Sequence, residues 1–239
     1  MKHDLLYEKY KDVFKDVPKG KLCVPLTGGL DSRVLAHFLP HIDLSFYIYT
    51  QRTYKNLNIV QKLWDHFKVD KTYPIYITDS FETAADALKL SGDVRRWWLI
   101  AGLNKLSKKI DLTDYTICIN EHSDFYTGLH LKLRHKSYEN YYINNVIPQH
   151  NKTFSDTFNN YFGNYWAPTI EGDFFIWCLN NLNYFDKFMQ RTYRKMIKKY
   201  MPELYHIPRC FETGKPISLD KNYTMYRLLN YFNKTSNFN

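Results

Sequence analysis

The chain has 239 residues, 44% of them hydrophobic and 18% aromatic, enough for one domain with a sizeable core. No stretch is long and apolar enough for a membrane helix, and the charged start lacks the apolar run of a secretory signal, so we expect a cytoplasmic protein without a membrane partner. The formal net charge of +9 fits an anionic partner, and both a nucleotide and a nucleic acid satisfy it.

The four cysteines are isolated from one another in the chain. No CxxC pair is present, which argues against a zinc ribbon, an iron–sulfur site and a disulfide framework. We interpret them as small buried residues. They are Cys23, Cys118, Cys178 and Cys210.

Short apolar strands alternate with amphipathic helices in the first half of the chain, which predicts an α/β fold with a parallel sheet and flanking helices. In chain order we expect a strand at 22–26, a helix at 33–39, a strand at 44–49, a helix at 56–67, a strand at 75–77, helices at 81–90 and 94–108, and a strand at 115–119. Pro25 is expected at the exit of the first strand, because it cannot donate to the ladder.

The second half is richer in Asn, Tyr and Phe. Its polar stretch 149–160 predicts a long loop, and 172–200 predicts a helical region that Pro202 ends. We therefore divide the chain into an α/β core, 1–135, and a mainly helical C-terminal portion of the same domain, 136–239.

A glycine loop follows the first strand and opens the first helix. Gly28 and Gly29 allow positive φ and a close approach of backbone N–H groups to an anion, and the helix N-terminus adds partial positive charge, so the loop suits pyrophosphate. Asp31 fits beside an anion if a divalent cation bridges them; as the alternative, it caps the helix. The loop reads LTGGLDS and comprises Leu26, Thr27, Gly28, Gly29, Leu30, Asp31 and Ser32, with the Thr27 and Ser32 hydroxyls as phosphate donors.

A second polar segment, NEHSDFYTG from Asn120 to Gly128, follows the strand at 115–119. Ligands in open α/β sheets bind outside the carboxyl ends of the strands. We therefore expect this segment and the glycine loop to face one site.

TGGLDS resembles the SGGxDS motif of the PP-loop family, the N-type ATP pyrophosphatases, with Thr27 in place of the first serine. NEHSDFYTG is similar to the GEGSDExFGG segment of the asparagine synthetase group, and Arg194 to Ile217 resembles the segment that closes the synthetase domain. The resemblance implies an adenine nucleotide alpha hydrolase-like fold that uses ATP and Mg²⁺. It implies an AMP-forming carbon–nitrogen ligase, which adenylates a small-molecule carboxylate, releases pyrophosphate and forms an amide.

The same resemblance implies roles for individual residues. Asp31 and Asp124 would bind magnesium, Glu121 would be the general base on the attacking amine, Ile48 would contact adenine, and Asn120 would lie beside the nucleotide. Ser123 falls on a family position, which makes it a substrate-binding candidate, and Arg95 and Arg96 lie where the family lines its acceptor site. Arg209 and Lys215 are the candidates for the family's catalytic lysine.

Several positions depart from the family pattern. Phe125 replaces an acidic residue, and His122 and Leu129 replace glycines. Lys2 follows Met1 where the family's glutaminase domain has its cysteine nucleophile, so we expect ammonia or an amine as donor, or a separate glutaminase subunit. Two other interpretations stay open: a tRNA-modifying PP-loop enzyme, favoured by the basic charge, and a non-catalytic nucleotide-binding descendant, favoured by these departures.

Overall fold

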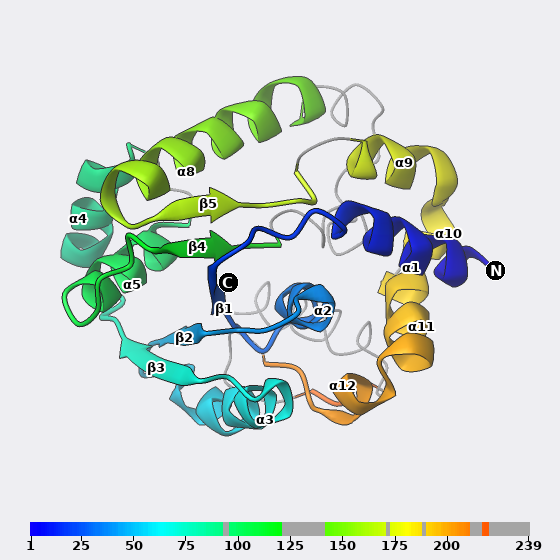
Figure 1. Cartoon of the computed structure of the whole chain (residues 1–239), viewed down its shortest axis with the longest axis horizontal. Helices are drawn as coiled ribbons and strands as arrows, with labels where there is room; N and C mark the ends of the chain where they lie inside the picture. The colour runs from blue at the N-terminus through cyan, green and yellow to red at the C-terminus, as the bar shows by residue number, and fades with distance from the viewer. Residues whose placement is uncertain (93–95, 121–141, 171–172, 188–189, 211–216, 220–239) are drawn as a thin grey trace, which may run out of the picture.

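A five-stranded parallel sheet forms the centre of the described part of the chain, with strand order β3-β2-β1-β4-β5 (Figure 1). The computed structural model describes residues 1–92, 96–120, 142–170, 173–187, 190–210 and 217–219. The strands are β1 (Lys21–Pro25), β2 (Leu44–Tyr49), β3 (Lys71–Tyr76), β4 (Tyr115–Cys118) and β5 (Asn164–Trp166). The predicted α/β fold with a parallel, helix-flanked sheet is confirmed.

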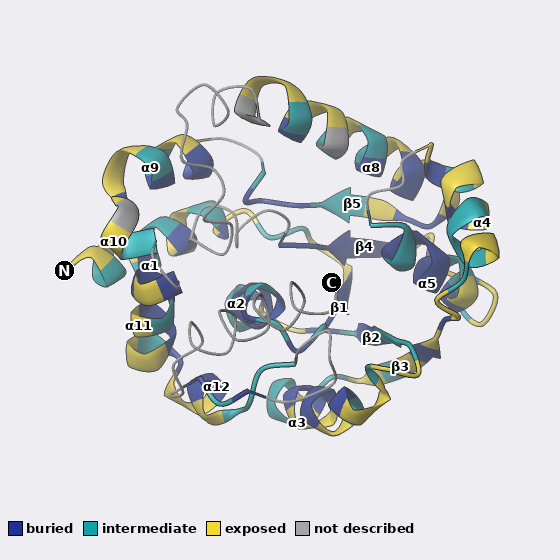
Figure 2. Cartoon of the chain, turned by 180° about the vertical axis from the view of Figure 1, so that it is seen from behind, coloured by how far each residue is buried: buried dark blue, intermediate teal, exposed yellow. Residues whose placement is uncertain are grey.

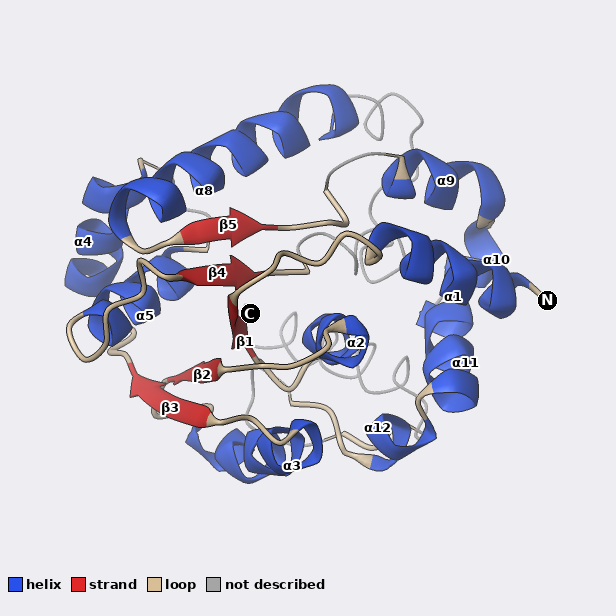
Figure 3. Cartoon of the chain, viewed as in Figure 1, coloured by secondary structure: helices blue, strands red, loops and turns tan. Residues whose placement is uncertain are grey.

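Helices cover both faces of the sheet (Figure 3). The buried side chains form two separate apolar clusters. One face carries α1 (Lys2–Val13), α2 (Leu30–Phe38), α3 (Leu57–Phe67), α9 (Phe174–Asn181), α11 (Arg191–Tyr200) and α12 (Pro202–His206). The other carries α4 (Phe81–Ser91), α5 (Trp97–Ser107) and α8 (Ile147–Tyr161). The shorter elements are η1 (Tyr54–Asn56), η2 (Tyr142–Val146) and α10 (Tyr184–Lys187). The mainly helical C-terminal portion is confirmed as well.

The central strands are buried on both faces, which explains their continuous apolar sequences (Figure 2). In β1, Leu22 and Val24 pack into one cluster and Cys23 into the other. Ser45 is a buried polar residue of β2 whose hydroxyl has hydrogen-bond partners inside the core. It donates to the Val24 carbonyl and accepts from Trp64 Nε1, both at 2.8 Å. Pro25 is the last residue of β1, as predicted.

The prediction of a loop at 149–160 is wrong, because this stretch belongs to the helix α8. Phe154 and Phe158, one helical turn apart, are both fully buried, and their apolar stripe is hidden in the sequence among Asn, Lys and Thr. Pro148 stands in the first turn of α8, where its missing N–H costs nothing.

Two further expectations for the second half needed correction. The helical region 172–200 is divided into α9, α10 and α11, and Pro202 begins α12 where we expected only a helix end. Strand β5 and helix α1 were not predicted. Since β5 pairs with β4, the C-terminal portion adds a strand to the sheet of the α/β core. Among the helices of the described ranges, none has the length and apolarity needed to cross a membrane.

Candidate functional site

The strand order reverses direction at β1, whose neighbours are β2 on one side and β4 on the other. Loops that leave adjacent strands at such a reversal run apart, and the resulting crevice is where open α/β sheets bind ligands. The loop 26–29 leaves β1 at this point and leads directly into α2. The sheet topology therefore places the glycine loop in the position typical of a ligand site.

Gly28 is the most constrained position of this loop. Its φ is +71°, a left-handed conformation that residues with a side chain rarely adopt. A Cβ atom at this position would lie 2.2 Å from Cys210 Sγ, closer than any real contact. Gly29, in contrast, has an ordinary φ of −76° as the N-cap of α2. The loop therefore requires glycine at position 28 for two independent reasons.

The hydroxyl groups of the loop bind its own backbone through long contacts. Thr27 N–H donates to Ser32 Oγ at 3.3 Å, Gly29 N–H donates to Thr27 Oγ1 at 3.3 Å, and Ser32 Oγ donates to the Gly29 carbonyl at 3.4 Å. The two hydroxyl oxygens are 3.2 Å apart. Hydrogen bonds of this length are weak, so an anionic ligand could replace them at little cost.

Asp31 is a convergence point for distant parts of the chain. The N-cap of α2 is Gly29 with no side-chain cap bond, so Asp31 is not the cap that we considered as its alternative role. Its Oδ1 accepts a hydrogen bond from the Tyr193 hydroxyl at 3.1 Å, and its carbonyl accepts one from Asn120 Nδ2 at 3.0 Å. Asn120 Oδ1 in turn accepts from Thr169 Oγ1 at 2.8 Å. Helix α11 thus contacts the carboxylate of Asp31, while the segment after β4 contacts its backbone carbonyl and is itself held by the segment after β5.

A cavity of about 460 Å³ opens at the carboxyl ends of β1, β2 and β3. The glycine loop contributes Thr27 and Gly29 to its wall. Its apolar wall comes from the ends of the strands and from the first turn of α5, and consists of Tyr47, Ile48, Ile77, Trp97 and Trp98. Burial raises the pKa of Tyr47 to about 12, so its hydroxyl stays neutral. The cavity therefore combines a polar loop with an aromatic and aliphatic surface.

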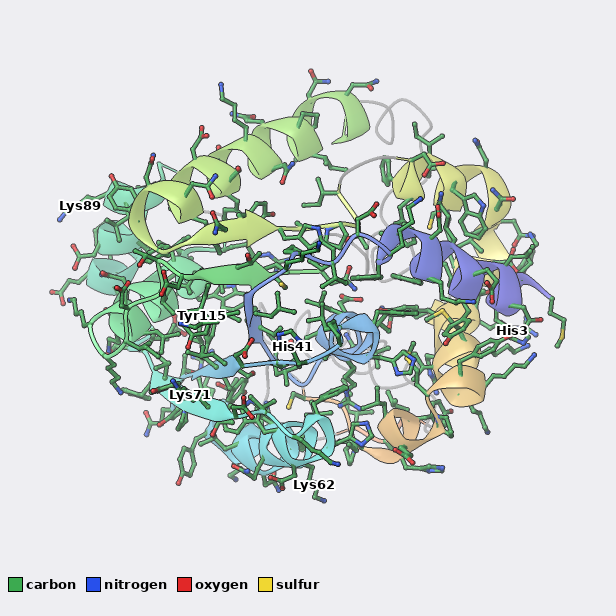
Figure 4. The ribbon with its side chains drawn as sticks, in the orientation of Figure 1. His3, His41, Lys62, Lys71, Lys89 and Tyr115 are labelled. Atoms are coloured by element: carbon green, nitrogen blue, oxygen red, sulfur yellow. The ribbon has the colours of Figure 1, made fainter. Side chains whose placement is uncertain are left out.

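Among the described residues that line the cavity, arginines outnumber carboxylates. The lining contains three arginines, Arg52, Arg96 and Arg209, and one acidic residue, Asp79. The Arg96 guanidinium lies 5.9 Å from the centre of the Trp98 ring, and Arg209 Nη1 donates to Gln190 Oε1 at 3.1 Å. The lining thus favours an anionic ligand. Lysines such as Lys62 and Lys89 point outward from the helices instead, as Figure 4 shows.

The structure brings five of the predicted site residues together around this cavity: Thr27, Gly29, Ile48, Arg96 and Arg209. Six more lie in the loop or contact it: Leu26, Gly28, Leu30, Asp31, Ser32 and Asn120. Five predicted site residues lie outside the described part of the chain: Arg95, Glu121, Ser123, Asp124 and Lys215.

Sequence reasoning missed several residues of this region. Arg52 follows β2 and Asp79 follows β3, so the rule that ligands bind at strand carboxyl ends could have found both. Tyr193 and Thr169 gave no such signal, because they reach the loop from distant segments of the second half.

Cys23, Cys118 and Cys178 are buried as expected, but Cys210 departs from the interpretation of the cysteines as small buried residues, because it is half-buried and lines the cavity. Desolvation raises the pKa of its thiol to about 12. We expect its alkylation by iodoacetamide to be slow and to accelerate about tenfold per pH unit between about pH 8 and pH 10, because the thiolate fraction grows in that proportion. Mass spectrometry of the labelled peptide measures the rate, with Cys210→Ser as control. A rate that levels off near pH 9 would contradict the raised pKa.

No cluster of three His, Cys, Asp or Glu side chains that could hold a metal occurs in the part of the chain that the structure describes. Comparison with models of known protein families gives no match, and comparison with curated proteins gives none either.

Proposed function

We propose that this chain binds ATP and uses it to adenylate a small-molecule carboxylate, releasing pyrophosphate and forming an amide with ammonia or an amine. The observation that carries the proposal is the Gly28–Gly29 loop, which joins β1 to α2 where the strand order reverses. Backbone N–H groups and the α2 N-terminus make such a loop a site for phosphate groups.

The adjoining cavity supports a nucleotide as the ligand. Its volume of about 460 Å³ falls in the range of small-molecule sites. Ile48 and Ile77 supply an apolar surface for a base, while Arg52 and Arg209 supply positive charge for phosphates. A neutral apolar ligand would leave these cations without a function, so a nucleotide fits the lining better.

The chemistry of Asp31 is compatible with magnesium. Mg²⁺ in nucleotide sites uses one or two carboxylates together with substrate phosphates, so a single described carboxylate beside a phosphate loop suffices. Asp31 would hold the ion, with its Oδ1 oriented by Tyr193, and the family resemblance adds Asp124. When bound, the ion offsets negative charge on the phosphates.

The reaction follows from which phosphates the loop holds. With the β- and γ-phosphates on the loop amides and on the Thr27 and Ser32 hydroxyls, the α-phosphorus faces the cavity and is open to in-line attack by a carboxylate oxygen. The products are an acyl-adenylate and pyrophosphate. An amine then attacks the acyl carbon, and AMP leaves. By resemblance, Glu121 would take the proton from that amine.

We expect AMP and pyrophosphate, with no ADP, when the protein is incubated with ATP, Mg²⁺, ammonia and a panel of carboxylates. Chromatography of ATP labelled at the α-phosphate identifies the nucleotide product. Asp31→Asn should lower turnover at least about a hundredfold, because loss of a group that only orients a metal ligand already costs 10- to 100-fold. Asp156→Asn, an exposed change on α8, is the matched control and should have no effect.

The outcomes separate the candidate functions. ADP as the product would exclude the pyrophosphatase reaction. Binding of ATP without turnover on any carboxylate would favour the non-catalytic nucleotide-binding alternative. Glu121→Gln should reduce amide formation more than pyrophosphate release, because the base acts only after adenylation.

A further inference from the structure

Arg33, in the first turns of α2, is completely buried and is surrounded by backbone carbonyls. Its Nη1 donates to the carbonyls of Leu204 at 2.9 Å and Ile207 at 2.5 Å. Its Nη2 donates to the Gly28 carbonyl at 3.0 Å and to that of Pro208. A single guanidinium therefore joins the glycine loop to residues 204–210, which we call the C-terminal strap.

A second contact fastens the same two segments. The Cys210 N–H donates to the Gly28 carbonyl at 3.1 Å, so this one oxygen accepts from both the strap and Arg33. A carbonyl oxygen turned toward phosphate would repel it. Because the Gly28 carbonyl oxygen accepts hydrogen bonds from these two donors, it is held toward Arg33 and the strap and does not repel the ligand.

Within the part of the chain that the structure describes, the hydrogen-bond acceptors of Arg33 are four neutral carbonyls and include no acidic side chain. Desolvation lowers its pKa to about 10, which still leaves it charged at neutral pH. Buried arginine is usually paired with a carboxylate, because a lone charge is costly to remove from water. Such a charge acts strongly on a nearby anion, since the surrounding dielectric constant is low.

A purely structural role would be to close the C-terminal end of α12, whose last carbonyls lack partners within the helix. That role alone needs neither contact with Gly28 nor a position beneath an anion-binding loop. The shared contact to Gly28 connects Arg33 to the ligand side.

We propose that Arg33 is a positioning residue for phosphate binding: it fixes the Gly28 carbonyl through the strap and places a buried positive charge beneath the loop. The ligand is the pyrophosphate end of the nucleotide, so this inference rests on the proposed function. Phosphate binding and the order of the strap are then coupled through one side chain.

Calorimetric titration with inorganic pyrophosphate and, separately, with adenosine tests the proposal. Arg33→Met should weaken pyrophosphate binding roughly ten- to a hundredfold, the effect of one charge several ångströms away at an effective dielectric constant of about 20. Arg33→Lys, which keeps the charge and loses the planar fork, should weaken it less. Adenosine affinity should not change in either variant. Lys62→Met removes one charge from the outer face of α3 (Figure 4) and is the matched control, expected to match the wild type.

A purely structural role would reduce both affinities together or neither, and either result from a folded Arg33→Met protein would overturn the inference. If that variant does not fold, hydrogen exchange of the wild type decides. Pyrophosphate, but not adenosine, should slow exchange of the amides in 204–210, and equal exchange with and without pyrophosphate would refute the coupling. Failure of the wild type to bind either ATP or pyrophosphate would instead overturn the proposed function, and the inference with it.

Discussion

Gly28→Ala should abolish nucleotide binding and lower the free energy of unfolding by about 2 kcal/mol or more, whereas Gly29→Ala should be nearly neutral for stability. At position 28 the new Cβ meets both a φ of +71° and the Cys210 sulfur at 2.2 Å. At position 29 the φ is ordinary, and the nearest atom, Thr27 Oγ1, lies at 3.2 Å. The two adjacent glycines therefore form a matched pair.

Urea denaturation of both variants gives the stability difference, and fluorescence titration with an ATP analogue gives the binding difference. Cys210→Ala combined with Gly28→Ala removes the closer clash, with the sulfur, and leaves the backbone strain and a contact with the Cβ of residue 210 at 2.9 Å. Partial recovery of stability in the double variant is expected. Equal stability of the two single variants would show that the left-handed conformation at position 28 is not required.

Much of the sheet could be predicted from the sequence, because the side-chain pattern that identifies a strand lies within a few adjacent residues. The strand at 44–49 is bounded as expected, because its aromatic and aliphatic side chains are buried or half-buried and its ends are marked by polar residues. Strand β5 was missed because three residues, Asn164 to Trp166, give no pattern of their own and pair only because β4 lies beside them. Helix α8 was missed because most of its residues are polar and the buried face is narrow.

The candidate site divides in the same way. The loop 26–32 was recognisable because its chemistry depends on residues adjacent in the chain. The residues that hold this loop in place were not recognisable from the sequence. Tyr193 lies 162 positions from Asp31, and the partners of Arg33 are backbone carbonyls, which carry no sequence signal. Arginine is ordinarily expected on the surface, so the burial of Arg33 could be known only from the structure.

Gly102 connects the packing of α5 to the width of the cavity, so a substitution at this position should change both stability and nucleotide binding. A Cβ at this position would lie 2.2 Å from Ile48 Cδ1 and 2.4 Å from Ile48 Cγ1. In α5, alanine gains up to about 1 kcal/mol of helix propensity over glycine. Overpacking costs about 1–3 kcal/mol, so the steric term should dominate. We therefore expect Gly102→Ala to destabilise the fold and to push Ile48 into the cavity, which weakens nucleotide binding.

A double-mutant cycle with Ile48→Ala tests this mechanism. Ile48→Ala alone should cost stability, because it removes packed methyl groups, but it also removes both atoms that Gly102→Ala would strike. The double variant should then be more stable than the sum of the single changes by about 1–3 kcal/mol, a coupling typical of residues in direct contact. Thermal denaturation supplies the four stabilities and adenosine titration the four affinities. Additive stabilities would show that Ile48 does not limit the approach of α5, in which case the glycine at position 102 would have to be explained by helix α5 itself rather than by the wall of the cavity.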